Sequence, residues 1–305
     1  MTKNNNQKST LRNSNSKIDP FKANKEKLAK KKNTSQASAK QYKELTGRKA
    51  LTEAPRLAKG KTSLVPVDQS IRLNKFIADA GISSRRKADE IIVSGVVKVN
   101  GIVITDLSTK VIKSDFVTVN GDPIGFEKNL IYIVLNKPKD TITTTKDEKG
   151  RKTVLDIVRK HTRVYPVGRL DRNTTGAILI TNDGELANRL THPKYEIIRE
   201  YNATLDKELR MEDAREIANG VELDDGTTGT CNLFIFPDDK TKVKLHIFEG
   251  KNREVRRIFE HFGYEIKKLD RKMFAGISTK GLNRSAYRHL EREEVRMLKK
   301  LVGIN

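Results

Sequence analysis

The chain has 305 residues, of which 61 are lysine or arginine and 39 are aspartate or glutamate, so its formal net charge is +22. This length accommodates about two domains of roughly 150 residues each. No stretch approaches the roughly 18 consecutive apolar residues of a membrane-spanning helix, and the start MTKNNNQKST lacks the apolar core of a secretory signal. We therefore expect a cytoplasmic protein with no membrane partner. The excess of positive charge argues against an ordinary small-molecule enzyme and indicates a polyanionic partner, with nucleic acid as the leading candidate.

The sequence predicts neither a metal site nor a cofactor. Cys231 is the single cysteine, which excludes intramolecular disulfides and CxxC zinc sites, and the five histidines lack metal-ligand spacing. No GxxxxGK[ST], GxGxxG, HExxH or GxSxG motif occurs, which argues against nucleoside triphosphatases, dinucleotide enzymes, zinc peptidases and serine hydrolases. With no tryptophan and 6% aromatic residues, phosphate contacts must supply most of the affinity for a nucleic acid.

Residues 1–69 are predicted to be a disordered basic tail. They are rich in Lys, Asn, Ser and Gln, and their apolar residues are too few to enclose a core. The segment holds 17 lysines and arginines against five acidic residues, which is +12 of the net charge. Such a tail can be a solubilising extension or a salt-sensitive RNA anchor, and the second interpretation is favoured because basic arms are frequent on nucleic-acid binders.

A helix–helix–strand module is predicted to follow at residues 70–118. Apolar residues from Leu73 mark the face of a first helix that stops at Gly81, and Ser83 or Ser84 can cap a second helix that ends at Gly95. Residues 96–99 and 102–104 flank Asn-Gly and predict a hairpin with a type I′ turn. A further strand at 116–119 ends at a second Asn-Gly.

Positive charge gathers on this module. Three basic residues occupy the first turn of the second helix, where they oppose the helix dipole by some tenths of a kcal/mol each, and a bound anion would relieve that cost. A phosphate-binding face is therefore favoured over a merely solvated one. The segment LNKFIADAGISSRRKADEIIVSGVVKVNG resembles the S4 RNA-binding domain of ribosomal protein S4 and several RNA-modifying enzymes. The predicted RNA contacts are Arg72, Lys75, Arg85, Arg86, Lys87 and Lys98.

Residues 126–305 alternate strands and helices and predict an α+β domain. Short turns between neighbouring strands favour a mainly antiparallel or mixed sheet flanked by helices. The periodicities predict strands at 131–135, 177–181, 197–205, 230–236, 242–248 and 264–269, and helices near 153–160, 184–190, 211–219, 252–262 and 290–300.

The most informative loop is GRLDRNTTG, in which Asp171 lies between Arg169 and Arg172. On residue type alone such an aspartate is more often a turn or cap residue than a catalytic one. Two neighbouring guanidinium groups would nevertheless keep its carboxylate ionised, as a nucleophile requires.

The wider pattern resembles the pseudouridine synthases of the RsuA/RluB family, which modify ribosomal RNA. The matching segments are GRLDRNTTG with ITNDGELANRLTHP, LNKP at 135–138 and EGKNREVRRIFEHFG at 249–263, in the family's order. The resemblance implies an isomerase with a catalytic domain at 126–305, acting on ribosomal RNA with neither metal nor cofactor. The sequence EGKNREVRR is more similar to the branch that acts on large-subunit RNA than to the small-subunit branch. We expect a monomer.

The resemblance also implies residue roles. Asp171 is the catalytic residue, and whether it attacks the sugar or promotes a glycal-like elimination stays open. Tyr201 stacks on the target base and can move a proton at C5, Arg256 pairs with Asp171, and Val255 packs under the base. Arg169 fills the position that the base vacates. The remaining predicted RNA contacts are Lys137, Lys251, Arg253 and Arg257, although Arg257 could also belong to a solvated helix face.

Two positions depart from the family pattern, and two other functions compete with it. Asp140 stands where the family often has glycine, and Ala177 stands where leucine is usual, which puts the shape of the loops in doubt. A non-catalytic RNA-binding or ribosome-assembly protein with the same fold is the main alternative, and the intact Asp171, Tyr201 and Arg256 argue against it. A ribosomal RNA methyltransferase would need a glycine-rich cofactor loop, which the sequence lacks.

Overall fold

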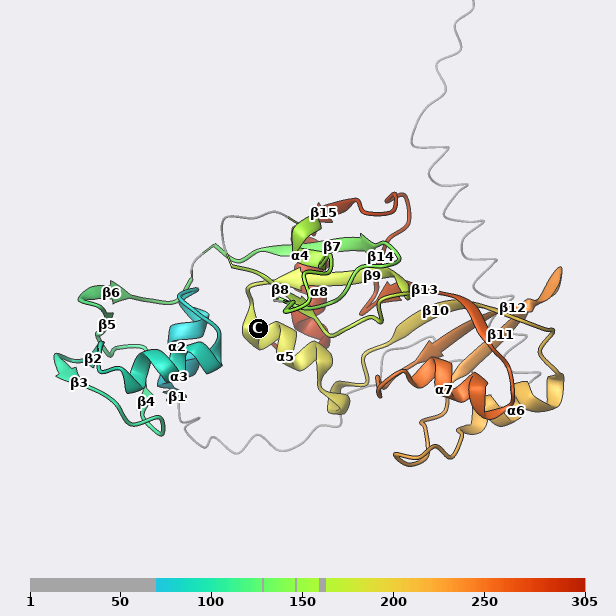
Figure 1. Cartoon of the computed structure of the whole chain (residues 1–305), viewed down its shortest axis with the longest axis horizontal. Coiled ribbons are helices and arrows are strands. Elements are labelled where there is room, and N and C mark those ends of the chain that lie inside the picture. Colours follow the sequence, from blue (N-terminus) through green and yellow to red (C-terminus); the bar gives the residue numbers. More distant parts are fainter. Residues whose placement is uncertain (1–69, 128, 146, 159–162, 305) are drawn as a thin grey trace, which may run out of the picture. The chain divides into compact units, whose positions relative to one another are not determined.

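The computed structural model describes residues 70–304, apart from 128, 146 and 159–162 (Figure 1). The predicted tail at 1–69 lies outside the described residues.

The N-terminal module has its own small core. Its helices are α2 (Leu73–Asp79) and α3 (Arg85–Val93), and Ser84 caps α3 by accepting a hydrogen bond from the Lys87 N–H. Its strands are β1 (Ile71–Arg72), β2 (Val97–Val99), β3 (Ile102–Val103), β4 (Lys110–Val111), β5 (Val117–Val119) and β6 (Asp122–Ile124). These form an antiparallel sheet in the order β3-β2-β5-β6 and a separate β1–β4 pair. The predicted Asn-Gly turn has positive φ at both residues, as a type I′ turn requires.

The rest of the chain is built on one nine-stranded sheet (Figure 1). Its order is β11-β12-β10-β13-β9-β7-β15, with β14 paired to β13 and β8 paired to β9. Among the described residues β13 and β9 pair in parallel, and the other strand pairs are antiparallel. The predicted mixed, mainly antiparallel sheet is therefore confirmed. The strands are β7 (Tyr132–Lys137), β8 (Tyr165–Val167), β9 (Thr175–Thr181), β10 (Arg199–Leu205), β11 (Asn232–Phe236), β12 (Asp239–Ile247), β13 (Ile266–Phe274), β14 (Ile277–Ser278) and β15 (Tyr287–His289).

Helices bury both faces of this sheet. Helices α4 (Val154–Ile157), α6 (Met211–Asn219) and α7 (Glu254–His261) contribute to one apolar cluster, and α5 (Gly184–Thr191) and α8 (Arg292–Leu301) contribute to another. The alternation of β7 divides its residues between the two clusters, because Ile133 and Leu135 belong to the first and Val134 to the second. The predicted helix 211–219 has the same bounds in the structure, whereas the helix expected near 153–160 ends at Ile157. A short 3₁₀ helix, η1 (Pro193–Tyr195), follows α5.

Gly176 allows the parallel pairing of β9 with β13. It pairs with Arg271 and has a φ of +108°, a conformation that favours glycine. A Cβ at this position would lie 2.1 Å from the carbonyl oxygen of Arg271, a backbone atom that cannot move without shifting β13.

We expect Gly176→Ala to lower the free energy of unfolding by about 2–3 kcal/mol, because both the backbone conformation and the close strand contact oppose a methyl group. Gly125→Ala is the matched control, since a Cβ there meets no atom within 4 Å. Urea denaturation measures both variants, and equal stability of the two would contradict this role for Gly176.

Candidate active site

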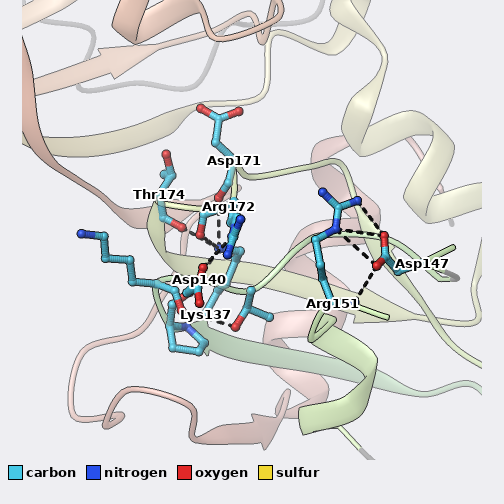
Figure 2. Close-up of polar contacts among 10 residues, drawn as sticks. Lys137, Asp140, Asp147, Arg151, Asp171, Arg172 and Thr174 are labelled. Carbon is cyan, nitrogen blue, oxygen red and sulfur yellow. Dashed lines mark hydrogen bonds and ion pairs between the residues drawn. The ribbon is translucent and has the colours of Figure 1, made fainter. Parts of the chain in front are cut away.

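The loop that carries Asp171 connects β8 to β9 and is fixed from beneath by a buried lysine. Lys137, the last residue of β7, lies opposite Gly176 of β9, which brings its side chain to the start of the loop. Its Nζ donates to the carbonyl oxygens of Asp171 at 3.0 Å, Arg172 at 3.1 Å and Thr174 at 2.8 Å. A fourth bond goes to its neighbour Pro138 at 3.1 Å. Figure 2 shows these bonds converging on Lys137, while the carboxylate of Asp171 points away from it.

The prediction that Lys137 contacts RNA is therefore wrong. Its side chain is fully buried, and its ammonium group is surrounded by backbone carbonyl oxygens of the protein. Burial lowers the pKa of Lys137 to about 8, against an attraction from Asp171 that acts in the opposite direction. Sequence reasoning failed here because a lysine in a basic chain is usually a surface residue, and nothing in LNKP indicates burial.

Two side chains hold the loop from its flanks. The Thr143 hydroxyl donates to the carbonyl oxygen of Leu170 at 2.9 Å and accepts from the N–H of Leu170 at 3.2 Å. Asp140 accepts a hydrogen bond from the guanidinium of Arg172. Asp140 has a φ of +61°, in the left-handed region that favours glycine and that aspartate tolerates better than most residues. This departure from the family pattern therefore keeps the required backbone conformation and adds an ion pair.

Asp171 faces Arg256 above this loop. The Nε of Arg256 lies 3.6 Å from a carboxylate oxygen of Asp171, and Nη1 of the same guanidinium donates to the Ile266 carbonyl at 3.2 Å. The Arg256 side chain is 14% exposed and that of Asp171 is 38% exposed, so the arginine forms the enclosed side of the pair. The motif match implied this contact. The carboxylate keeps access to a ligand while a cation holds it in place.

A pocket of about 410 Å³ opens beside this pair. It is lined by Asp171 from the β8–β9 loop, Tyr201 from β10, and Val255 and Arg256 from the first turn of α7. Tyr201 is 8% exposed and Val255 is 5% exposed, which gives the pocket an aromatic and an aliphatic surface. The structure thus brings together the four residues that the resemblance implied for catalysis and for the base.

Three further pocket residues were not predicted. Arg199, Glu254 and Arg271 line the cavity and are at most 9% exposed. Arg199 lies two residues before Tyr201 on β10, so the alternation that placed Tyr201 could have placed Arg199 on the same face. Arg271 pairs directly with Tyr201 across β10 and β13, a long-range contact that one sequence does not reveal.

Glu254 shares a hydrogen bond with Glu249 at the start of α7. Burial raises the pKa of Glu254 above the ordinary range of a glutamate, and the Glu249 carboxyl raises it further. A Glu254 oxygen also accepts from the Lys251 N–H at 3.0 Å, which ties the preceding loop to the helix. The helix begins at Glu254, two residues after the predicted start, because Arg253 has a φ of +48°.

The predicted RNA contacts near α7 already have partners within the protein. Arg257 forms two hydrogen bonds with Asp225, Arg253 bonds Glu260, and Lys251 donates to the carbonyl oxygens of residues 226 and 227. Arg169 differs, because it is exposed, lines the pocket and forms no ion pair with the described residues.

The basic residues of the N-terminal module reach its surface. Arg72, Arg85, Arg86, Lys87 and Lys98 are exposed, while Lys75 is half-buried and paired with Asp79. Their contact with RNA stays a prediction.

Among the described residues, no helix is long and apolar enough to cross a membrane. No group of three or more His, Cys, Asp or Glu side chains in that part of the chain could hold a metal ion.

Comparison with known proteins assigns the chain to a family. The model of RNA pseudouridylate synthases matches residues 131–261, and the S4 domain model matches residues 71–117. The "Ribosomal large subunit pseudouridine synthase B" of Bacillus subtilis (strain 168) is 44% identical over 235 residues, which cover 75% of this chain and 96% of the relative. The chain belongs to the RNA pseudouridine synthase family, in its RsuA/RluB branch.

Two other members support this assignment. The "Dual-specificity RNA pseudouridine synthase RluF" of Escherichia coli (strain K12) is 37% identical over 242 residues, covering 77% of this chain and 80% of that synthase. A solved structure titled "Crystal structure of pseudouridylate synthase" has a TM-score of 0.56 and 27% identity, and the match covers 75% of this chain and 99% of that one. The predicted family and α+β fold class are therefore confirmed.

We expect Lys137→Met to lower kcat for pseudouridine formation about 100-fold. The loop that carries Asp171 loses its central hydrogen-bond donor, and a small displacement of a catalytic group can lower the rate by this factor. The Kd for RNA should change by less than about twofold, since the ammonium reaches no solvent. Lys139→Met is the control, because this neighbouring lysine is exposed. A weakened Kd with an unchanged kcat would restore the RNA-contact interpretation.

A second prediction concerns the pH dependence of stability. Because the pKa of Glu254 is raised in the folded chain, the folded state binds more protons than the unfolded state, and stability falls as the pH rises from about 5 to about 8. Glu254→Gln removes this titration and should flatten the change in melting temperature over that range. Glu293→Gln, an exposed control, should leave it unaltered. An unchanged slope in Glu254→Gln would contradict the raised pKa.

Proposed function

We propose that this protein isomerises a uridine of large-subunit ribosomal RNA to pseudouridine, with Asp171 as the catalytic residue. The observation that carries the proposal is the Asp171–Arg256 pair at a pocket that Tyr201 and Val255 also line. Family membership supports the reaction, and the printed name of the Bacillus subtilis relative supports the large-subunit substrate.

The reaction is an isomerisation, so it needs no oxidant and the product has the same atoms as the substrate. The N1–C1′ bond of uridine breaks, the ring turns over, C5 bonds to C1′, and the proton on C5 is exchanged for one on N1. Asp171 can attack C1′ or remove a proton from C2′, and both routes use its ionised form. The guanidinium of Arg256 lies 3.6 Å from that carboxylate and orients it.

The target base has to leave its helix or loop before Asp171 can reach the sugar, which costs a few kcal/mol of stacking. Tyr201 offers the flipped base a new stacking surface, and Val255 supports it from the side of α7. Arg169, which is exposed and lines the pocket, would take the place of the base in the RNA. The basic face of the N-terminal module would hold the surrounding phosphates.

The arrangement of the chain follows from this function. We assign residues 1–69 to a basic tail, 70–118 to the S4 RNA-binding domain and 126–305 to the synthase domain. The protein would act in the cytoplasm as a monomer. Ribosomal RNA or its assembling precursor is the partner, and neither a metal nor a cofactor enters the reaction.

We expect Asp171→Asn to abolish pseudouridine formation, with at least about a 1000-fold loss in turnover, while the melting temperature and RNA affinity stay close to those of the wild type. Pseudouridine mapping of large-subunit RNA from cells with and without the gene identifies the modified position. Asp238→Asn, which removes an exposed carboxylate from the turn between β11 and β12, is the control.

Two results would contradict the proposal. Full activity in a folded Asp171→Asn variant would remove Asp171 from the mechanism. An unchanged pseudouridine map with retained ribosome binding would favour the non-catalytic assembly protein.

A further inference from the structure

Two buried arginines lie together in the pocket, apart from the Asp171–Arg256 pair. Arg199 is 9% exposed and Arg271 is 3% exposed. Their guanidinium carbons lie 5.5 and 4.8 Å from the centre of the same Phe274 ring. The protein contributes backbone acceptors only: Arg199 Nη1 donates to the carbonyl oxygens of Ile197 and Phe248, and Arg271 Nε donates to that of Ala177.

Neither of these arginines has an anionic partner. Among the described residues, no carboxylate lies within 4 Å of the charged nitrogens of Arg199 or Arg271. Tyr201, Glu254 and Glu249 act on Arg199 only over longer distances, and burial raises the pKa of the Glu254 carboxyl. Burial, followed by repulsion from Arg271, lowers the pKa of Arg199. Two buried charges without a counter-charge are costly unless a ligand supplies one.

Unused hydrogen-bonding atoms point to the same conclusion. Nη2 of Arg271 and Oγ1 of Thr174 are buried without a hydrogen-bond partner, and both residues line the pocket. Positive charge dominates the lining, with six cationic side chains against two carboxyl groups. The cationic residues are Arg169, Arg199, Lys251, Arg253, Arg256 and Arg271, and the acidic ones are Asp171 and Glu254.

The depth at which a group enters the pocket decides which part of a nucleotide can contact Arg199 and Arg271. A phosphodiester continues into the RNA chain on both sides, so it stays near the mouth, where Arg169 is exposed. The base is the free end of a flipped nucleotide and enters furthest. Arg271 lies directly opposite Tyr201 in the strand register, which places its guanidinium beside the surface on which the base stacks.

We propose that Arg199 and Arg271 form an anion site for the detached uracil ring, which stabilises the negative charge that the ring carries between cleavage and rejoining. This inference rests on the proposed function and adds a role for two residues within it. When N1–C1′ breaks, the bonding electron pair stays on the ring, which becomes an anion shared by N1 and the carbonyl oxygens. C5 then supplies the electron pair of the new bond to C1′, and the proton lost from C5 is balanced by one gained at N1. Fixed cations in a dry site stabilise such charge more than water does.

The test varies the basicity of the departing ring. RNA with 5-fluorouridine at the target position releases a more stable anion than uridine does, because fluorine withdraws electrons, so it depends less on a cationic site. We expect Arg271→Met to slow single-turnover consumption of the N-glycoside about 100-fold with uridine and less than about tenfold with 5-fluorouridine. Nuclease digestion and chromatography of timed samples measure both rates.

Three further variants make the result decisive. Arg199→Met should show the same difference between uridine and 5-fluorouridine. If thermal melting shows that Arg271→Met is unfolded, Arg199→Met takes its place in the test. Arg271→Lys keeps a cation and should recover part of the uridine rate. Arg288→Met removes an arginine paired with Glu294 outside the pocket and should lose the same small factor with both bases.

Equal losses with uridine and 5-fluorouridine in the folded Arg271 and Arg199 variants would overturn the anion site and leave a structural role. Absence of pseudouridine formation by the wild-type protein would instead overturn the proposed function.

Discussion

The position of Asp171 depends on the buried ammonium group of Lys137. Three carbonyl oxygens of the loop that carries Asp171 converge on this group, and a fourth comes from the residue that follows the lysine. Carbonyl dipoles stabilise the charge without a carboxylate, so Asp171 can direct its own carboxylate toward Arg256. The antiparallel pairing of β7 with β9 makes this possible, because it places the end of one strand beside the start of the other.

The cations of the site differ in what they contact. Lys137 binds backbone oxygens, and Arg256 pairs with the carboxylate of Asp171. Arg199 and Arg271 form no ion pair with the described residues. The net charge of the pocket alone does not describe these different contacts. Side chains of the same charge therefore support the loop, orient Asp171 or line the pocket without an ion pair, and the environment of each nitrogen decides which.

The sequence predicted those parts of the structure that short-range patterns encode. Hydrophobic spacing located the principal helices and strands, and the motif at 249–263 led to the contact between Arg256 and Asp171. It could not show that Lys137 is buried, because burial depends on β9 packing beside β7. It missed Arg271 for a related reason, since the contact with Tyr201 comes from strand pairing across about 70 residues.

The anchoring of the Asp171 loop also determines whether the protein or the RNA changes shape on binding. The loop is held by Lys137 at its backbone carbonyl oxygens, by Thr143 at Leu170 and by Asp140 at Arg172. It therefore has little freedom to fold over a substrate. The conformational work of binding then falls on the RNA, which has to present an extruded nucleotide to a preformed pocket. Bulges, loops and weakly stacked sites require the least distortion. The ease with which the RNA deforms thus becomes a selection criterion, in addition to its base sequence.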